Sequence, residues 1–200
     1  MPCLPAAASA EMLHHRFTCI LAEVETLGCT TVICSDKTGT LTLNEMCCTQ
    51  MVLPQSASEM KSFKVEGNGY SPVGHVNGLS IDWSSNKALR FFCKVATLCN
   101  DSRLTMESES SNITRTGEPT EAALRVLVEK LGCPDEELAR KNLEKPRDRN
   151  SIMAFNDYWG ANVKKQATLE FARDRKSMSV LCTDAQVQSE NVLYIKGAGL

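Results

Sequence analysis

The 200-residue sequence predicts a mixed α/β (α+β) fold, and three hydrophobic patterns support this prediction. Residues 30–34 form a short β-branched and apolar run, which is typical of a buried strand in a parallel sheet. Residues 84–99 and 124–131 place apolar side chains at helical spacing. Residues 166–182 alternate between apolar and polar on either side of a charged turn, which predicts a β-hairpin. The chain is long enough to bury a core in one or two domains.

The predicted strand 30–34 leads directly into a polar, glycine-containing loop, and the segment 34–42 reads CSDKTGTLT. Asp36 then lies at the carboxyl end of a strand, where open α/β sheets place their ligand chemistry. Gly39 permits a tight turn that presents backbone N–H groups to an anion. Asp36 is therefore a candidate carboxylate nucleophile for a phosphoryl group. The alternative is a simple turn residue, which is the more common role of a single aspartate at such a position.

The composition argues against several classes of function. The net charge of -2 gives no indication of a nucleic-acid partner or of an anionic membrane surface. The ten cysteines are irregularly spaced and include no C-x-x-C pair, which argues against a zinc site and favours free thiols. No apolar run approaches the roughly 18–20 residues of a membrane helix, so we expect a soluble piece of something larger or a truncated gene model. Residues 1–20 have the composition of a disordered leader.

The first half of the chain after the Asp36 loop predicts two short strands and one helix. Residues 47–53 alternate weakly, and residues 62–65 form a second short strand among turn-forming Gly, Ser and Pro residues. The helix predicted at 84–99 has one apolar face, and Ser84 or Ser85 is positioned to cap its start. These residues have an adequate structural explanation as core elements, so no chemistry is assigned to them.

The middle of the chain predicts a loop and two helices. Residues 103–115 are polar, and we expect a surface loop there. A second helix is predicted to open within residues 116–121, with Pro119 in its first turn, to carry a regular apolar stripe and to end at Gly132. The next segment is charged and irregular, with a short helix predicted at 135–143. Trp159 is compatible with either a core position or an exposed loop, and the pattern does not decide between them.

The hairpin at 166–182 carries a possible nucleotide site at its turn. An exposed aromatic ring at Phe171 beside the cations Arg173 and Lys176 suits a nucleotide, because the ring stacks on a base while the cations face phosphates. The alternative is a core aromatic residue beside a turn whose charges only keep the surface soluble. Residues 192–198 predict a further strand that runs into Lys196-Gly197.

Several of these segments resemble one protein family. The segment Asp36–Thr42, DKTGTLT, resembles the phosphorylation motif of P-type ATPases. The segments at 25–30, 44–46 and 170–180, and the Lys196-Gly197-Ala198 string, resemble the calcium pumps of the sarco/endoplasmic-reticulum type. Related haloacid-dehalogenase phosphatases carry a second Asp where this chain has Thr38, and Thr38 cannot serve as their general acid or base. A phosphorylated Asp36 would therefore persist, which favours a pump over a phosphatase.

The resemblance implies a domain organisation and a set of site residues. Residues 21–46 would begin an incomplete Rossmann-like (haloacid-dehalogenase-like) phosphorylation domain, and residues 47–200 would form a nucleotide-binding domain with an antiparallel sheet and flanking helices. Glu121 has a structural explanation at the positive end of a helix dipole, but the resemblance favours a nucleotide contact. The implied catalytic residues are Asp36, Lys37, Thr38 and Thr40, with Asp36 and Thr38 as a partial Mg²⁺ site; the implied ATP-binding residues are Glu121, Phe171, Arg173, Lys176, Lys196 and Gly197.

The resemblance also implies an activity. In a full-length pump, ATP would phosphorylate Asp36 with Mg²⁺ as cofactor and so drive calcium transport, on the cytosolic face of the endoplasmic reticulum or another endomembrane. The membrane would be reached only through segments that this chain lacks. The downstream strings that complete the magnesium site are also missing from the sequence, so the chain alone is expected to bind ATP without turning it over. The alternative is a free-standing nucleotide-binding module without transport activity.

Overall fold

The structure is a computed structural model of the chain, and it describes Val24 and residues 28–106, 112–144, 148–161, 163–184 and 191–198. The predicted leader at 1–20 lies outside the described residues. The chain divides into two compact units, Met1–Leu43 and Asn44–Leu200, which we call the N-terminal unit and the main unit. Each unit is described by itself.

The described part of the N-terminal unit is an extended and exposed segment followed by a turn. Residues 32–36 have no regular secondary structure, and η1 (Lys37–Leu41) is a single irregular turn in which Gly39 has a φ of 75°. The prediction of a buried strand at 30–34 is therefore wrong for this structure, because these residues are exposed and none of them belongs to a strand. A parallel strand becomes buried only where neighbouring strands and covering helices surround it, and no described residue supplies them here.

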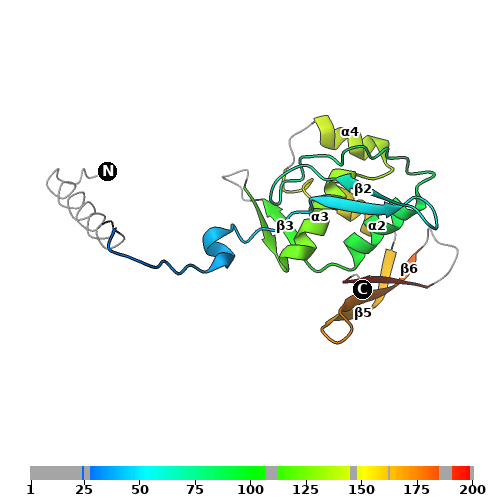
Figure 1. Cartoon of the computed structure of the whole chain (residues 1–200). Helices are drawn as coiled ribbons and strands as arrows, with labels where there is room; N and C mark the ends of the chain where they lie inside the picture. The colour runs from blue at the N-terminus through cyan, green and yellow to red at the C-terminus, as the bar shows by residue number, and fades with distance from the viewer. Residues whose placement is uncertain are drawn as a thin grey trace, which may run out of the picture. The chain divides into compact units, whose positions relative to one another are not determined.

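The main unit begins with a small antiparallel sheet and a helical layer (Figure 1). Strands β1 (Gln50–Pro54) and β2 (Met60–Lys64) pair with each other, and so do β3 (Arg103–Met106) and β4 (Ile113–Thr116). The helices are α2 (Lys87–Leu98), α3 (Pro119–Leu131), α4 (Glu136–Glu144) and α5 (Ala154–Ala161). Helices α2, α3 and α5 pack against one another and enclose the main core.

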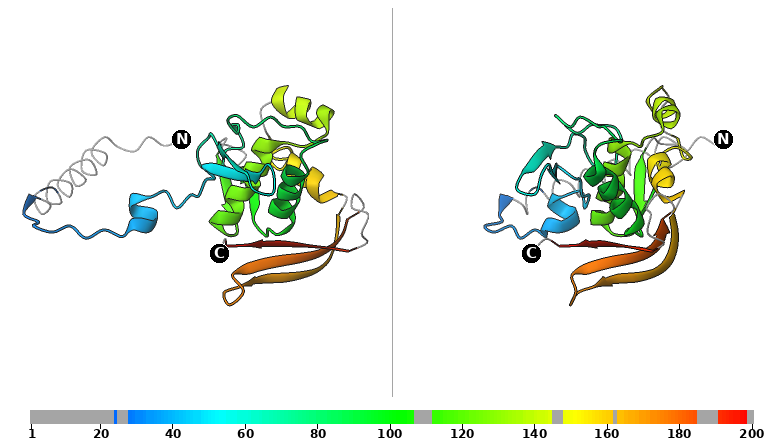
Figure 2. Two further views of the ribbon diagram at one scale, coloured as in Figure 1. Left: turned by 45° about the vertical axis from the view of Figure 1, so that its right-hand side comes forward. Right: turned by 90° about the vertical axis from the view of Figure 1, so that its right-hand side faces the viewer.

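The main unit ends with a three-stranded antiparallel sheet in the order β5-β6-β7. Its strands are β5 (Val163–Ala172), β6 (Ser177–Asp184) and β7 (Val192–Gly197). Both views of Figure 2 show this sheet lying beneath the helical layer. Helix α2 supplies Leu98 and Cys99 to the apolar cluster that joins the two layers. The predicted hairpin at 166–182 and the predicted strand at 192–198 are thus confirmed.

The structure settles one residue that the sequence left open and corrects three expectations. Trp159 is buried, its Nε1 donates to the Gly132 carbonyl at 3.0 Å, and its ring lies 5.3 Å from that of Trp83. Residues 103–106 and 113–116 form paired antiparallel strands rather than a loop, because their polar side chains pair across the strands, as Thr105 and Thr114 do at 2.9 Å. Helix α5 was not predicted at all.

The third correction concerns the start of helix α2. Asn86, rather than Ser84 or Ser85, caps it, and the Asn86 Oδ1 accepts from the Leu89 amide at 2.9 Å. Both serines are instead hydrogen-bonded to the carboxylate of Asp82. The helix predicted to open within 116–121 and to end at Gly132 is confirmed as α3, since Pro119 lies in its first turn and Gly132, with a φ of 86°, follows its last residue.

Candidate functional site

The predicted nucleophile lies in the N-terminal unit on an exposed turn. The Asp36 Oδ1 accepts from the Thr38 amide at 3.4 Å, and the Thr42 hydroxyl donates to the Lys37 carbonyl at 3.3 Å. The Gly39 amide donates in turn to the Thr42 hydroxyl at 3.3 Å. Asp36, Lys37, Thr38 and Thr40 are all exposed. The turn therefore presents the Asp36 carboxylate to solvent, where it can react with a ligand brought to it.

In the main unit, two predicted ATP-binding residues form an ion pair. The Lys196 ammonium from the end of β7 lies 2.6 Å from the Glu121 Oε1 in the first turn of α3, although 75 positions separate them in sequence. The Glu121 Oε2 accepts from the Asp101 amide at 2.9 Å. Glu121 thus keeps its place at the positive end of the helix and also joins α3 to β7 and to the loop after α2.

The surroundings of Glu121 shift its acidity. Burial by itself raises the pKa of this carboxyl, but the hydrogen bonds from Lys196 and from the Asp101 amide together outweigh burial, so the pKa lies below its ordinary value. A lowered pKa means that the folded state prefers the ionised form. The stabilisation is complete above the unfolded-state pKa and is lost as the pH falls through the folded-state pKa.

We expect Glu121→Gln to destabilise the chain by about 1 kcal/mol at neutral pH, because an amide cannot pair with the Lys196 charge. The difference in the free energy of unfolding between the wild type and the variant should narrow as the pH falls through the folded-state pKa of Glu121, because the carboxyl is then protonated in both the folded and the unfolded chains. Urea unfolding of both proteins at pH 7 and at acid pH measures this difference in the free energy of unfolding. A constant difference across this range would contradict the assignment.

The loop that follows α2 is fixed to α3 by an arginine that the sequence reasoning missed. The Arg125 Nε donates to the Ser102 carbonyl at 3.1 Å and the Nη2 to the Asn100 carbonyl at 3.0 Å. The Asn100 Nδ2 donates to the Glu121 carbonyl at 2.8 Å. These bonds hold the Asp101 amide where it meets the Glu121 carboxylate. The only sequence signal was the i, i+4 spacing of Glu121 and Arg125 on one helix face.

A β-bulge sets the position of Phe171 in the sheet. Leu169 pairs with Ser179 and Ala172 with Ser177, so Glu170 and Phe171 together lie opposite Met178. Met178 pairs on its other side with Lys196, which puts Phe171 and Lys196 on the two strands that flank Met178. The Met178 side chain is buried, whereas the Phe171 ring is 60% exposed. An exposed aromatic ring is available to stack on a nucleotide base.

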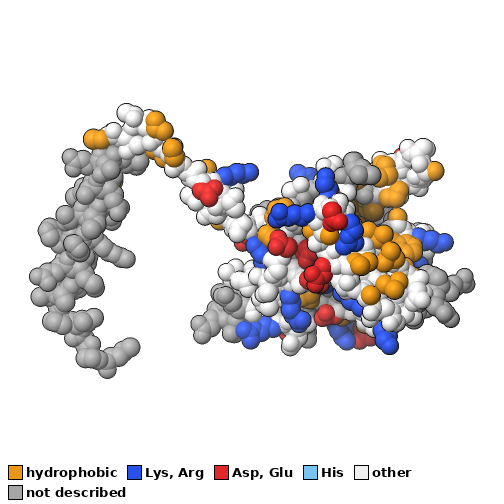
Figure 3. All heavy atoms as spheres, turned by 90° about the horizontal axis from the view of Figure 1, so that it is seen from below, with side chains coloured by type: hydrophobic (Ala, Val, Ile, Leu, Met, Phe, Trp, Pro, Cys, Tyr) orange, Lys and Arg blue, Asp and Glu red, His pale blue; other side chains and the backbone are white. Residues whose placement is uncertain are grey.

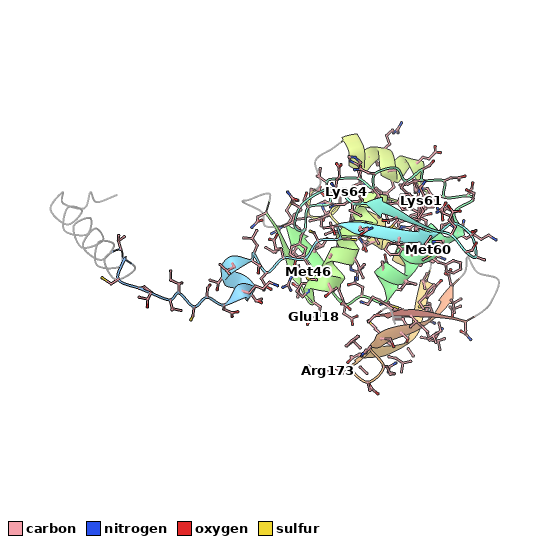
Figure 4. The ribbon with its side chains drawn as sticks, in the orientation of Figure 1. Met46, Met60, Lys61, Lys64, Glu118 and Arg173 are labelled. Atoms are coloured by element: carbon pink, nitrogen blue, oxygen red, sulfur yellow. The ribbon has the colours of Figure 1, made fainter. Side chains whose placement is uncertain are left out.

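The turn between β5 and β6 carries the predicted phosphate ligands. Arg173 projects at the tip of this hairpin (Figure 4) and is exposed, as is Lys176, whose φ of 49° is unusual for a non-glycine residue. The Ala198 amide donates to the Lys176 carbonyl at 3.1 Å. A Cβ added to Gly197 would lie 2.9 Å from that carbonyl oxygen, so glycine at this position has a structural reason besides any ligand contact.

The other face of the sheet is apolar and lacks this chemistry. Leu169 and Ile195 flank Ser179 on this face, and Leu193 lies on the same face two residues before Ile195 on β7. All three side chains are about half exposed. Seen from below, the main unit shows hydrophobic side chains gathered on this side (Figure 3). The polar and aromatic groups of the candidate site therefore belong to the hairpin tip and to the face that carries Lys196.

Metal and membrane features are sparse in the described parts of the chain. Among these residues, no group of three or more His, Cys, Asp or Glu side chains is arranged to hold a metal ion. Within the same segments, no helix has both the length and the apolar character that crossing a bilayer requires.

Comparison with known families identifies the class of protein that these features define. The family model described as "P-type ATPase, cytoplasmic domain N" matches residues 88–199, which include all of the candidate site in the main unit. The mixed α/β main unit, with its small antiparallel sheets and flanking helices, agrees with that domain. The chain belongs to the P-type ATPase family.

Three of the relatives are calcium-transporting ATPases of Arabidopsis thaliana. Calcium-transporting ATPase 3, endoplasmic reticulum-type, is 43% identical over 187 residues, or 89% of this chain and 18% of that protein. Calcium-transporting ATPase 2, endoplasmic reticulum-type, is 43% identical over 187 residues and is covered to 17% of its length. Calcium-transporting ATPase 4 of the same type is 40% identical over 182 residues, or 16% of its length. The chain therefore spans less than a fifth of the length of these relatives.

Proposed function

We propose that the main unit binds ATP at the site formed by the β5–β6 hairpin, the end of β7 and the start of α3. The carrying observation is the bulge in β5, which leaves the Phe171 ring exposed on the strand across Met178 from Lys196. In this proposal the adenine stacks on Phe171. Arg173 and Lys176 hold the phosphates, and Lys196, Gly197 and Glu121 border the adenine pocket.

We further propose that Asp36 accepts the γ-phosphate of ATP. A carboxylate oxygen of Asp36 forms the new bond to phosphorus, the bond from phosphorus to the β-phosphate oxygen breaks, and ADP leaves. Lys37 and Thr40 would position the transferred group. Asp36 and Thr38 would hold Mg²⁺, because this ion prefers hard oxygen ligands such as theirs. The bound ion would neutralise phosphate charge. Thr38 offers no general base for hydrolysis, so the acyl phosphate would persist.

The role of the whole protein follows as a proposal from the relatives. The relatives are named as endoplasmic reticulum-type calcium-transporting ATPases, so we propose that a longer protein containing this chain transports calcium across the endoplasmic reticulum or another endomembrane. The second candidate is a free-standing nucleotide-binding module. It is favoured by the fact that every proposed ATP ligand lies within the main unit.

Calorimetric titration with ATP tests the binding site. We expect Lys196→Met to weaken ATP binding about tenfold, because it removes a positive charge beside the bound nucleotide. Lys64→Met is the matched control, since Lys64 is an exposed lysine on β2 in the same unit (Figure 4). Equal affinity of the wild type and the Lys196 variant would show that the site is wrongly placed.

Incubation with γ-labelled ATP and Mg²⁺ tests phosphoryl transfer. The chain alone is proposed to bind ATP without turnover, because Asp36 and Thr38 supply only part of a magnesium site. We therefore expect no acid-stable label on the 200-residue chain. In a longer pump that contains the chain we expect label that Asp36→Asn abolishes. Label on the isolated wild-type chain would contradict the first expectation, and label on the Asp36→Asn pump would contradict the second.

A further inference from the structure

A buried ion pair crosses the boundary between the two layers of the main unit. The Lys94 ammonium on α2 lies 2.5 Å from the Asp184 Oδ2 at the end of β6. Lys94 is 6% exposed and Asp184 is 1% exposed. Removing two such charges from water is costly and is offset only when their geometry is good and further hydrogen bonds are made. The pair has no part in the proposed chemistry, so its position requires another explanation.

A buried tyrosine completes the cluster, which we call the Lys94–Asp184–Tyr194 triad. The Tyr194 hydroxyl on β7 donates to the Asp184 Oδ2 at 2.5 Å. The Tyr194 carbonyl also accepts a weak hydrogen bond from the Cys99 Sγ at 3.3 Å. Each member comes from a different element, namely α2, β6 and β7. The triad therefore joins one helix to two adjacent strands.

This junction is where the sheet meets the helical layer. Helix α2 packs against the sheet mainly at β7, and apolar side chains such as Leu98, Met178 and Val180 fill the interface. Apolar packing of this kind is non-directional, so by itself it does little to fix the position of the sheet on α2. A buried charge pair favours one arrangement, because a displacement would separate two charges that are costly to bury apart.

The proposed nucleotide site is divided between the same two layers. Glu121 and the Asp101 amide belong to the helical layer, whereas Phe171 and Lys196 belong to the sheet. The Glu121–Lys196 ion pair spans the division. Tyr194 precedes Lys196 by two residues on β7, so both lie on the same face of that strand. A shift of the sheet on α2 would therefore move Lys196 relative to Glu121.

We propose that Lys94, Asp184 and Tyr194 are positioning residues that fix the three-stranded sheet on α2 and so hold Lys196 against Glu121. The triad acts through Lys196 and does not touch the nucleotide. This inference rests on the proposed function only for its effect on ATP. The placement of Lys196 against Glu121 is a property of the chain without any ligand.

The test replaces the triad by apolar residues of similar size. The triple variant Lys94→Met, Asp184→Leu and Tyr194→Phe removes both charges and the hydroxyl and keeps the packing, so we expect its urea midpoint to stay near that of the wild type. We expect its Glu121 carboxyl, followed by NMR, to titrate at higher pH than in the wild type. Its ATP affinity should fall about tenfold. The matched control is Glu137→Leu with Lys141→Met, which removes an exposed ion pair on α4.

The outcomes separate a positioning role from a merely structural one. If the triple variant keeps the wild-type Glu121 titration, packing alone places the sheet and the inference is wrong. If the triple variant does not fold, Tyr194→Phe alone decides, since it removes one hydroxyl, and an unchanged Glu121 titration again overturns the inference. If the wild type does not bind ATP, the proposed function fails while the Glu121 titration still supports or overturns the positioning role.

Discussion

Arg125→Met is expected to destabilise the main unit by about 3 kcal/mol, because a buried polar group that loses its partner costs about 1–3 kcal/mol. Arg125 donates to the carbonyls of Asn100 and Ser102, and both of these residues are buried. Its Nη1 also donates to the Asn156 Oδ1 at 3.2 Å. Methionine replaces much of the aliphatic stem and makes none of these bonds. Urea unfolding followed by circular dichroism measures the change.

Arg90→Met is the control for this experiment. Arg90 is exposed on α2 and makes a long hydrogen bond of 3.4 Å to the Trp83 carbonyl. Its replacement should change the free energy of unfolding by less than about 0.5 kcal/mol. Equal effects of the two substitutions would mean that Arg125 contributes no more than an ordinary surface arginine. We also expect Arg125→Met to weaken ATP binding, because the loop that Arg125 holds supplies the Asp101 amide to Glu121.

The sequence predicted best the elements whose signals are local. The helix at 119–131 has its proline, its apolar stripe and its terminal glycine within one short segment, and the structure places its ends at Pro119 and Leu131. The hairpin strands β5 and β6 alternate on either side of a charged turn, so their pairing needs no distant information. The family resemblance likewise depends on short motifs, whose recognition needs no information from distant residues.

The sequence predicted worst the features that depend on distant residues. Residues 30–34 have the composition of a buried strand, but composition is not sufficient where no described strand pairs with them. The polar residues of β3 and β4 hide the alternation of a strand, so the sequence alone predicts a loop there. The Glu121–Lys196 pair and the triad joining Lys94 to Asp184 each connect residues more than 70 positions apart. No spacing rule predicts such contacts, and motif knowledge identifies Glu121 and Lys196 without their geometry.

Phe171→Ala is expected to weaken ATP binding by about 1–3 kcal/mol, or roughly 5- to 150-fold, which is the usual contribution of one ring stacked on one base. The ring is 60% exposed in the ligand-free chain, so its removal should leave the free energy of unfolding almost unchanged. Binding and stability should therefore separate in this variant. Calorimetric titration with ATP gives the first quantity, and urea unfolding gives the second.

Leu169→Ala is a close control, because Leu169 lies two residues earlier on the same strand and is 52% exposed. The bulge between the two positions interrupts the alternation of side chains, and Leu169 faces the apolar side of the sheet beside Ser179. Truncation there removes a comparable exposed apolar group without removing a ring from the proposed site. If both variants lose ATP affinity equally, the loss comes from a general disturbance of β5, and stacking on Phe171 is wrong.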